Sequence, residues 1–183
     1  MIEVRWHGRG GQGGWTAARL LGKSAALFED KFALSFPSFG PERRGAPVLG
    51  FTKIDNKKIL DRSEVENSDY VVVLDDTLIN ETTARGIKEK GTIVINTLEK
   101  EKFQSVFPDK NIVTVDATGI ALEILGRPIT NTAMLAALVS ATDVVSLESL
   151  KSAVTDELSP AIVEKNIKVI ETVYDKVKEE LNG

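Results

Sequence analysis

The stretch IEVRWHGRGGQGGWTAARLLGKSAALF, residues 2–28, decides the fold of this chain. Residues 2–6 alternate apolar and polar side chains, which predicts a short first strand. A glycine-rich turn, residues 8–14, follows directly. Apolar side chains then recur at helical spacing as far as Phe28, which predicts an amphipathic helix of about four turns. The chain therefore opens with a strand, a glycine turn and a helix.

Strands and helices continue to alternate along the rest of the chain. Short apolar or β-branched runs predict further strands at residues 48–54, 58–60, 70–74, 92–96 and 112–116. The first two of these are joined by the polar turn Asp55-Asn56, so they are expected to be antiparallel. Helical spacing follows at residues 78–90, 98–103, 117–125, 131–139 and 147–154, and from Pro160 onward. We predict one domain, residues 1–183, with an α/β fold of three layers (α/β/α) and a mixed, mostly parallel sheet.

Composition and charge exclude several classes of partner. The 183 residues include 23 Lys and Arg against 27 Asp and Glu, a net charge of −4, so the chain has no general attraction for nucleic acid or an anionic membrane. Its longest apolar runs fall far short of the ~18–20 residues of a membrane span. No basic segment followed by an apolar one opens the chain, and a cytoplasmic location is expected.

Cysteine and histidine usage limits the chemistry that this chain can carry. It has no cysteine and one histidine, His7, which excludes disulfides, thiolate-held zinc, iron–sulfur clusters, a cysteine nucleophile and a multi-histidine metal site. We therefore expect the chain to hold no metal and no redox centre of its own.

The glycine turn has two interpretations. Gly8, Gly10 and Gly13 match the pattern G-x-G-x-x-G between a strand and a helix, where glycines let the backbone approach a phosphate and the helix start attracts an anion. Alternatively, the glycines only form a tight turn or touch another subunit. A NAD site also needs an acidic residue at the end of a second strand, whereas Glu29 and Asp30 end the first helix.

A second candidate segment, residues 34–47, contains three prolines and is expected to be an ordered loop. It presents Arg43 and Arg44, whose guanidinium groups suit a carboxylate or a phosphate; the alternative is a surface ion pair with Glu42. His7 at the strand end is more often a structural residue than a ligand. Asp75-Asp76 is interpreted as a cap of the helix expected at residues 78–90.

Three segments together resemble a known family: GRGGQG at residues 8–13, FGPERRGAP at residues 39–47 and NTAML at residues 131–135. They resemble the gamma subunit of 2-oxoacid:ferredoxin oxidoreductases, the group that includes the pyruvate, 2-ketoisovalerate and 2-oxoglutarate enzymes. The resemblance covers essentially the whole chain and implies the fold of domain III of pyruvate:ferredoxin oxidoreductase. Gly14-Trp15 departs from the smaller or aliphatic residues expected there.

The resemblance implies a complex with alpha, beta and delta (ferredoxin-like) subunits. Those partners would bind thiamine diphosphate, Mg and iron–sulfur clusters, and the assembly would convert a 2-oxoacid and coenzyme A to an acyl-CoA and carbon dioxide while reducing ferredoxin. The gamma chain would carry no catalytic residue and would be inactive alone. Its candidate cofactor-binding residues are Gly8, Gly10, Gly11, Gln12, Gly13, Arg43 and Arg44. Whether they contact coenzyme A or only partner subunits stays open, as do a purely scaffolding role and a free-standing nucleotide-binding module.

Overall fold

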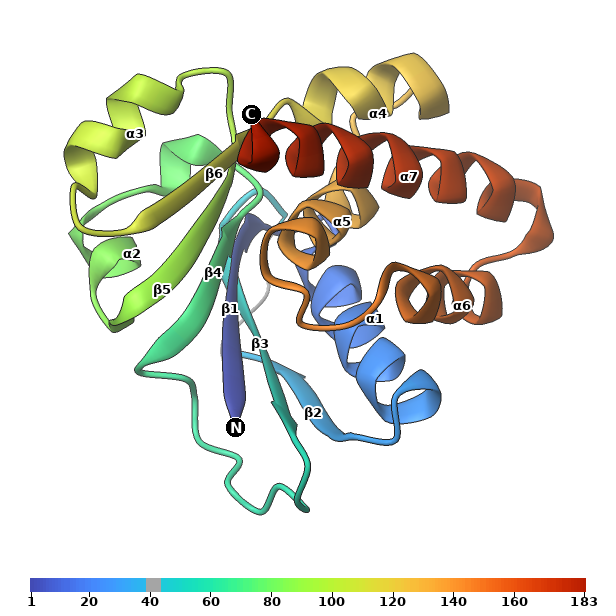
Figure 1. Ribbon diagram of the computed structural model, residues 1–183, viewed down its shortest axis with the longest axis horizontal. Helices are drawn as coiled ribbons and strands as arrows, with labels where there is room; N and C mark the ends of the chain where they lie inside the picture. Colours follow the sequence, from blue (N-terminus) through green and yellow to red (C-terminus); the bar gives the residue numbers. More distant parts are fainter. Residues whose placement is uncertain (39–43) are drawn as a thin grey trace.

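The computed structural model describes residues 1–38 and 44–183, and its centre is a six-stranded mixed sheet (Figure 1). The spatial order is β2-β3-β1-β4-β5-β6. The strands are β1 (Ile2–Arg9), β2 (Phe32–Pro37), β3 (Pro47–Asp55), β4 (Ser68–Val73), β5 (Ile87–Asn96) and β6 (Asn111–Val115). β3 is antiparallel to both of its neighbours, and the pairs from β1 to β6 are parallel. The expectation of a mixed, mostly parallel sheet is confirmed.

Helices cover both faces of the sheet unequally. They are α1 (Gly14–Phe28), the 3-10 turn η1 (Asp76–Leu78), α2 (Glu81–Ala84), α3 (Lys100–Val106), α4 (Ala117–Leu125), α5 (Asn131–Thr142), α6 (Leu147–Glu157) and α7 (Pro160–Asn182). Figure 1 shows α1 and α4 to α7 on one side and the short α2 and α3 on the other, so the three layers are confirmed. None of the helices in the described ranges is long and apolar enough to cross a membrane.

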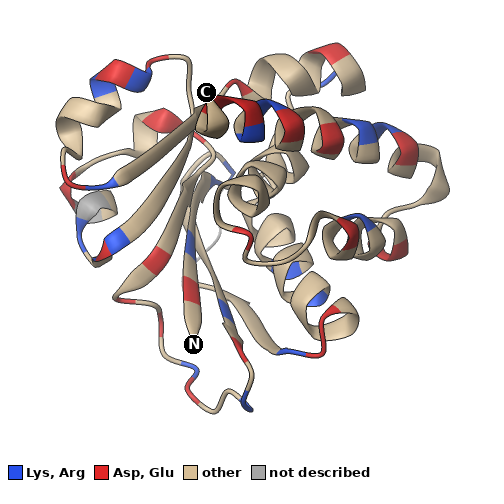
Figure 2. Cartoon of the chain, viewed as in Figure 1, with Lys and Arg blue, Asp and Glu red and all other residues tan. Residues whose placement is uncertain are grey.

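The larger core lies between the sheet and the long helices. Trp6 of β1, Leu20 and Leu21 of α1 and Val173 of α7 are buried in it. Helix α5 runs through its middle and is buried all round from Thr132 to Ser140, which explains why its sequence has no polar face. The charged residues of α7 lie on its outer side, where blue and red alternate along the helix in Figure 2.

The predicted loop at residues 34–47 is partly wrong, because it begins inside strand β2. Phe32, Leu34 and Phe36 alternate with smaller residues, and β2 pairs only with β3, at the edge of the sheet. An edge strand tolerates proline, and Pro37 is its last residue, opposite Gly50. The remainder of the expected loop includes residues 39–43, which lie outside the described residues.

Two further predictions are wrong for topological reasons. Residues 58–60 form no strand, because β2 and β1 already occupy both edges of β3. Residues 78–90 do not form the single helix that was expected: the chain makes only η1 and the short α2 before Gly86, at φ 67°, turns it into β5. A Cβ on Gly86 would lie 1.7 Å from the carbonyl oxygen of Glu66, so this turn accepts only glycine.

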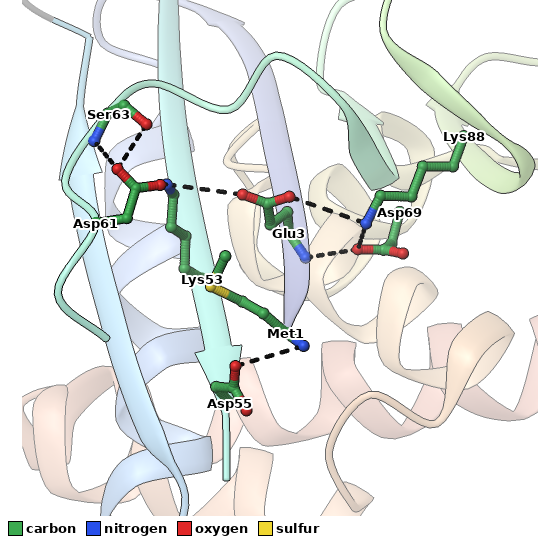
Figure 3. Close-up of polar contacts among 8 residues, drawn as sticks. All are labelled: Met1, Glu3, Lys53, Asp55, Asp61, Ser63, Asp69 and Lys88. Carbon is green, nitrogen blue, oxygen red and sulfur yellow. Dashed lines mark hydrogen bonds and ion pairs between the residues drawn. The ribbon is translucent and has the colours of Figure 1, made fainter. Parts of the chain in front are cut away.

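A cluster of charged side chains lies at the amino end of β1 (Figure 3). The side chain of Lys53 on β3 is 1% exposed and lies between Asp61 at 2.6 Å and Glu3 at 3.6 Å. Lys88 of β5 extends the cluster, 3.8 Å from Glu3 and 2.8 Å from Asp69. The hydrogen bond from Lys53 holds the pKa of the Asp61 carboxyl well below its usual range. This cluster ties the irregular segment 56–67 to the sheet.

Candidate functional site

The two segments singled out in the sequence meet at the carboxyl end of β1. Gly10 forms a β-bridge with Arg44, its N–H donates to the carbonyl of Ala46 at 2.9 Å, and its carbonyl accepts from the N–H of Gly45 at 3.0 Å. In α/β sheets, ligands bind beyond the carboxyl ends of the strands. The glycine turn and the Arg44 segment therefore form one surface at that position, while Arg43 lies outside the described residues.

The glycine turn has backbone conformations that other residues rarely adopt. Gly11 has a φ of 95° and Gly13 a φ of 78°. A Cβ on Gly13 would also lie 2.7 Å from Nδ2 of Asn131 at the start of α5. Gly13 is therefore required both for the turn and for the close approach of α1 to α5. A Cβ on Gly8 would meet only ordinary contacts, the nearest 3.6 Å away at Gln12 Oε1.

A carboxylate beneath the turn holds it in place. Asp75 accepts from Arg9 Nε at 2.9 Å and from Gln12 Nε2 at 3.1 Å, and Gln12 Oε1 accepts from the N–H of Arg9 at 2.7 Å. The other guanidinium nitrogens of Arg9 donate to the carbonyl of Gly45 at 3.1 Å and to Thr77 Oγ1 at 2.9 Å. Arg9 thereby connects the glycine turn, the Arg44 segment and the end of β4.

The two described arginines of this surface differ in their ion pairs: Arg9 is paired with Asp75, and Arg44 is not paired with a described residue. Burial raises the pKa of the Asp75 carboxyl, but hydrogen bonds from Thr77, Gln12 and Arg9 outweigh it and lower that pKa below its ordinary value. Asp75 is therefore ionised at neutral pH, and it neutralises Arg9. Arg44 is exposed and has no ion pair with any described residue; the alternative ion pair with Glu42 lies outside the described residues.

The expected cap by Asp75 is confirmed for a different element. Asp75 accepts from the N–H of Thr77 at 3.1 Å and caps η1, whereas the helix expected there does not exist. The role of Arg9 and the link from Asp75 to the turn were not predicted from the sequence. The available signal was an arginine inside the glycine turn, three residues before Gln12, together with an acid directly after a buried parallel strand.

His7 lies just before the turn and is buried. It is 8% exposed, and burial, followed by the nearby positive charge of Arg5, lowers its pKa to about 3. Its imidazole is therefore neutral, and Nε2 has no hydrogen-bond partner. This environment agrees with the structural interpretation of His7.

The surface has the groups that bind anions rather than those that hold metals or NAD. Among the described residues, no group of three or more His, Asp or Glu side chains could hold a metal ion. Glu29 ends α1 at the far end from the glycine turn, where it accepts from the N–H of Ser146 at 2.5 Å. It therefore serves the contact between α1 and α6 and lies too far along the helix to bind a ribose at the turn.

Comparisons with known proteins agree with one another over nearly the whole chain. A family profile described as "Pyruvate ferredoxin/flavodoxin oxidoreductase" matches residues 3–176. The chain is 47% identical over 178 residues to "Pyruvate synthase subunit PorC" of Methanocaldococcus jannaschii, covering 97% of each chain. It is 50% identical over 182 residues to "Pyruvate/ketoisovalerate oxidoreductases common subunit gamma" of Thermococcus kodakarensis, covering 96% of this chain and 97% of that one.

A solved structure has the same fold. The pyruvate oxidoreductase subunit PORC (EC 1.2.7.1) of Thermotoga maritima superposes with a TM-score of 0.83 at 36% identity, covering 95% of each chain.

Proposed function

Because the chain belongs to the pyruvate ferredoxin/flavodoxin oxidoreductase family, we propose that it presents the surface formed by its glycine turn and Arg44 to the other subunits of such an enzyme. The chain is the gamma subunit of a 2-oxoacid:ferredoxin oxidoreductase. It forms a single domain, residues 1–183, in a cytoplasmic complex.

The chemistry of the complex takes place on partner chains. The alpha, beta and delta subunits hold thiamine diphosphate, Mg and the iron–sulfur clusters, and ferredoxin accepts the electrons. The complete reaction converts a 2-oxoacid and coenzyme A to an acyl-CoA and carbon dioxide. This gamma chain contributes no catalytic residue and is inactive alone, which its lack of cysteine supports.

At the shared surface, the gamma chain positions the phosphates of coenzyme A. The observation that carries this proposal is the β-bridge between Gly10 and Arg44, because it brings the turn with the exposed Gly11 next to a guanidinium that has no ion pair among the described residues. Gln12 is engaged with Asp75 and Arg9, so it fixes the turn. The proposed coenzyme A surface consists of Gly8, Gly10, Gly11, Gln12, Gly13, Arg43 and Arg44.

The double variant Arg43→Ala, Arg44→Ala of the complete complex tests the proposal. The apparent KM for coenzyme A is expected to rise about tenfold, since charge-assisted hydrogen bonds are lost, while the KM for the oxoacid and the elution volume of the complex stay unchanged. Arg62→Ala, an exposed arginine in the segment 56–67, is the matched control. Unchanged assembly and an unchanged KM for coenzyme A in the double variant would refute the proposal.

Two alternatives make different predictions. A pure scaffold predicts that the double variant assembles poorly but turns over normally once assembled. A free-standing nucleotide-binding module is not favoured, because relatives matched over nearly the full chain are named as subunits. It would require NAD or ATP to raise the melting temperature of the isolated chain.

A further inference from the structure

A second concave site lies on the helical side of the sheet. It is a cavity of about 390 Å³ between α1, α5, the start of α7 and the segment that precedes α5. Its apolar lining residues are Leu20, Leu125, Ile129, Leu158, Ala161 and Ile162. Its volume falls within the range of about 300–1,000 Å³ that is usual for small-molecule sites. No residue of the glycine turn or of the Arg44 segment lines it.

Two cations that form no ion pair with any described residue line this cavity. Arg127 and Lys165 both line it and both are exposed. In the part of the chain that the structure describes, neither forms an ion pair, and no acidic side chain lines the cavity. Their charges are therefore available to an anion in the cavity.

Two buried polar side chains of the lining, Thr132 and Asn166, are already paired. Thr132 Oγ1 donates to Asn166 Oδ1 at 2.9 Å, and Asn166 Nδ2 donates to the carbonyl of Ile162 at 2.9 Å. These two side chains therefore need no hydrogen bond from a ligand, and the apolar wall beside them can receive an apolar body. Recognition of charge is left to the two cations.

The amino ends of three helices add positive potential to that of these side chains. Helices α1, α5 and α7 all begin near the cavity, which is lined by Thr16, Asn131 and Ala161 from their first turns. None of these three helices is capped by a hydrogen bond from the side chain of its N-cap residue, in contrast to α4 and α6. The positive ends of the helix dipoles therefore add to the attraction of the cations for an anion.

We propose that this cavity binds an amphipathic carboxylate, with its apolar body against the leucines and isoleucines and its carboxylate at Arg127 and Lys165. The site goes beyond the proposed role of the glycine turn, because it shares no residue with it. Two sources offer this chemistry: a 2-oxoacid with a branched apolar side chain, and a medium-chain fatty acid.

Equilibrium dialysis of octanoate against the assembled complex tests the proposal, with octanol as the uncharged counterpart. The double variant Arg127→Ala, Lys165→Ala is expected to bind octanoate about tenfold more weakly and octanol equally well, because exposed charge pairs each contribute modestly. Ala161→Trp, which fills the cavity, should remove the binding of both compounds. Lys168→Ala, an exposed lysine of the same helix that does not line the cavity, should change neither.

The two sources are distinguished by repeating the dialysis with 4-methyl-2-oxopentanoate. Tighter binding of this compound that the double variant weakens assigns the site to a branched 2-oxoacid, and tighter binding of octanoate assigns it to a fatty acid. The proposal is overturned if the complex does not bind octanoate, or if the double variant binds it as well as the unmodified complex. It is also overturned if only the isolated gamma chain binds octanoate, because a partner subunit then covers the cavity.

Discussion

Replacing His7 with phenylalanine should remove a large part of the acid sensitivity of this chain. His7 is the single histidine, so no other side chain has an ordinary pKa between about 5 and 7. Its imidazole is buried and neutral, with Nε2 unpaired. Phenylalanine fills a similar volume without a polar atom to leave unsatisfied.

The magnitude follows from the two pKa values of the imidazole. Its pKa is about 3 in the folded chain and 6.5 in the unfolded chain, so the unfolded chain binds the proton more readily between these values. The stability is therefore complete above pH 6.5 and falls as the pH is lowered toward 3. At pH 5, the loss is about 2 kcal/mol. His7→Phe should abolish this loss and should change the stability near pH 7.5 by less than about 1 kcal/mol.

Urea denaturation at pH 7.5 and pH 5 measures the effect directly. The free energy of unfolding of the unmodified chain should fall by about 2 kcal/mol more between these pH values than that of His7→Phe. A matched control places a histidine at the exposed turn position 56 of that variant (Asn56→His), which should leave the pH dependence absent. Equal losses in the unmodified chain and in His7→Phe would refute the reasoning that burial keeps the imidazole neutral.

Other substitutions test the glycine turn and the cluster of charged side chains at the amino end of β1. Gly13→Ala should lower the free energy of unfolding by about 2–3 kcal/mol, while Gly11→Ala, with a positive φ but nothing within 4 Å, should cost about 1 kcal/mol; equal losses in urea denaturation would contradict the contact with α5. Asp75→Asn should lower the free energy of unfolding by about 1–3 kcal/mol, because the guanidinium of Arg9 loses its counter-charge. An unchanged midpoint of urea denaturation would contradict this role of Asp75. Lys53→Met should speed tryptic cleavage within residues 56–67, since the buried ammonium fastens this segment; an unchanged cleavage rate would show that other contacts hold it.

Local pattern was sufficient for most of the fold. The strand, glycine turn and helix at the start, the buried strand at β4 and the start of α7 at Pro160 are all signalled within a few residues. The failures at residues 58–60 and 78–90 have a non-local cause. Which edges of β3 are free, and which glycine meets the carbonyl of Glu66, are decided by segments distant in the sequence.

In the candidate site, too, the sequence identified the segments but not the contacts between distant residues. The two loops were identified from glycine, proline and arginine content, and their residue types left anion binding as one of two interpretations of each loop. The contacts that join them were not predictable, because Arg9 and Asp75 are 66 residues apart and meet only through the parallel pairing of β1 with β4. The cavity between the helices left no sequence signal at all, since its lining residues come from α1, the segment before α5, α5 and α7, whose helical patterns predict only packing.

Two carboxylates, one near each end of strand β4, accept hydrogen bonds from β1. Asp69 accepts from the backbone N–H of Glu3 at 2.8 Å, and Asp75 accepts from Arg9 at 2.9 Å. A slip of one residue between the strands would turn every side chain to the opposite face and break both anchors together. The two anchors therefore favour a single alignment of this strand pair, and the second anchor fixes the glycine turn to the sheet. Any displacement of the glycine turn relative to the sheet would have to break the contact between Arg9 and Asp75.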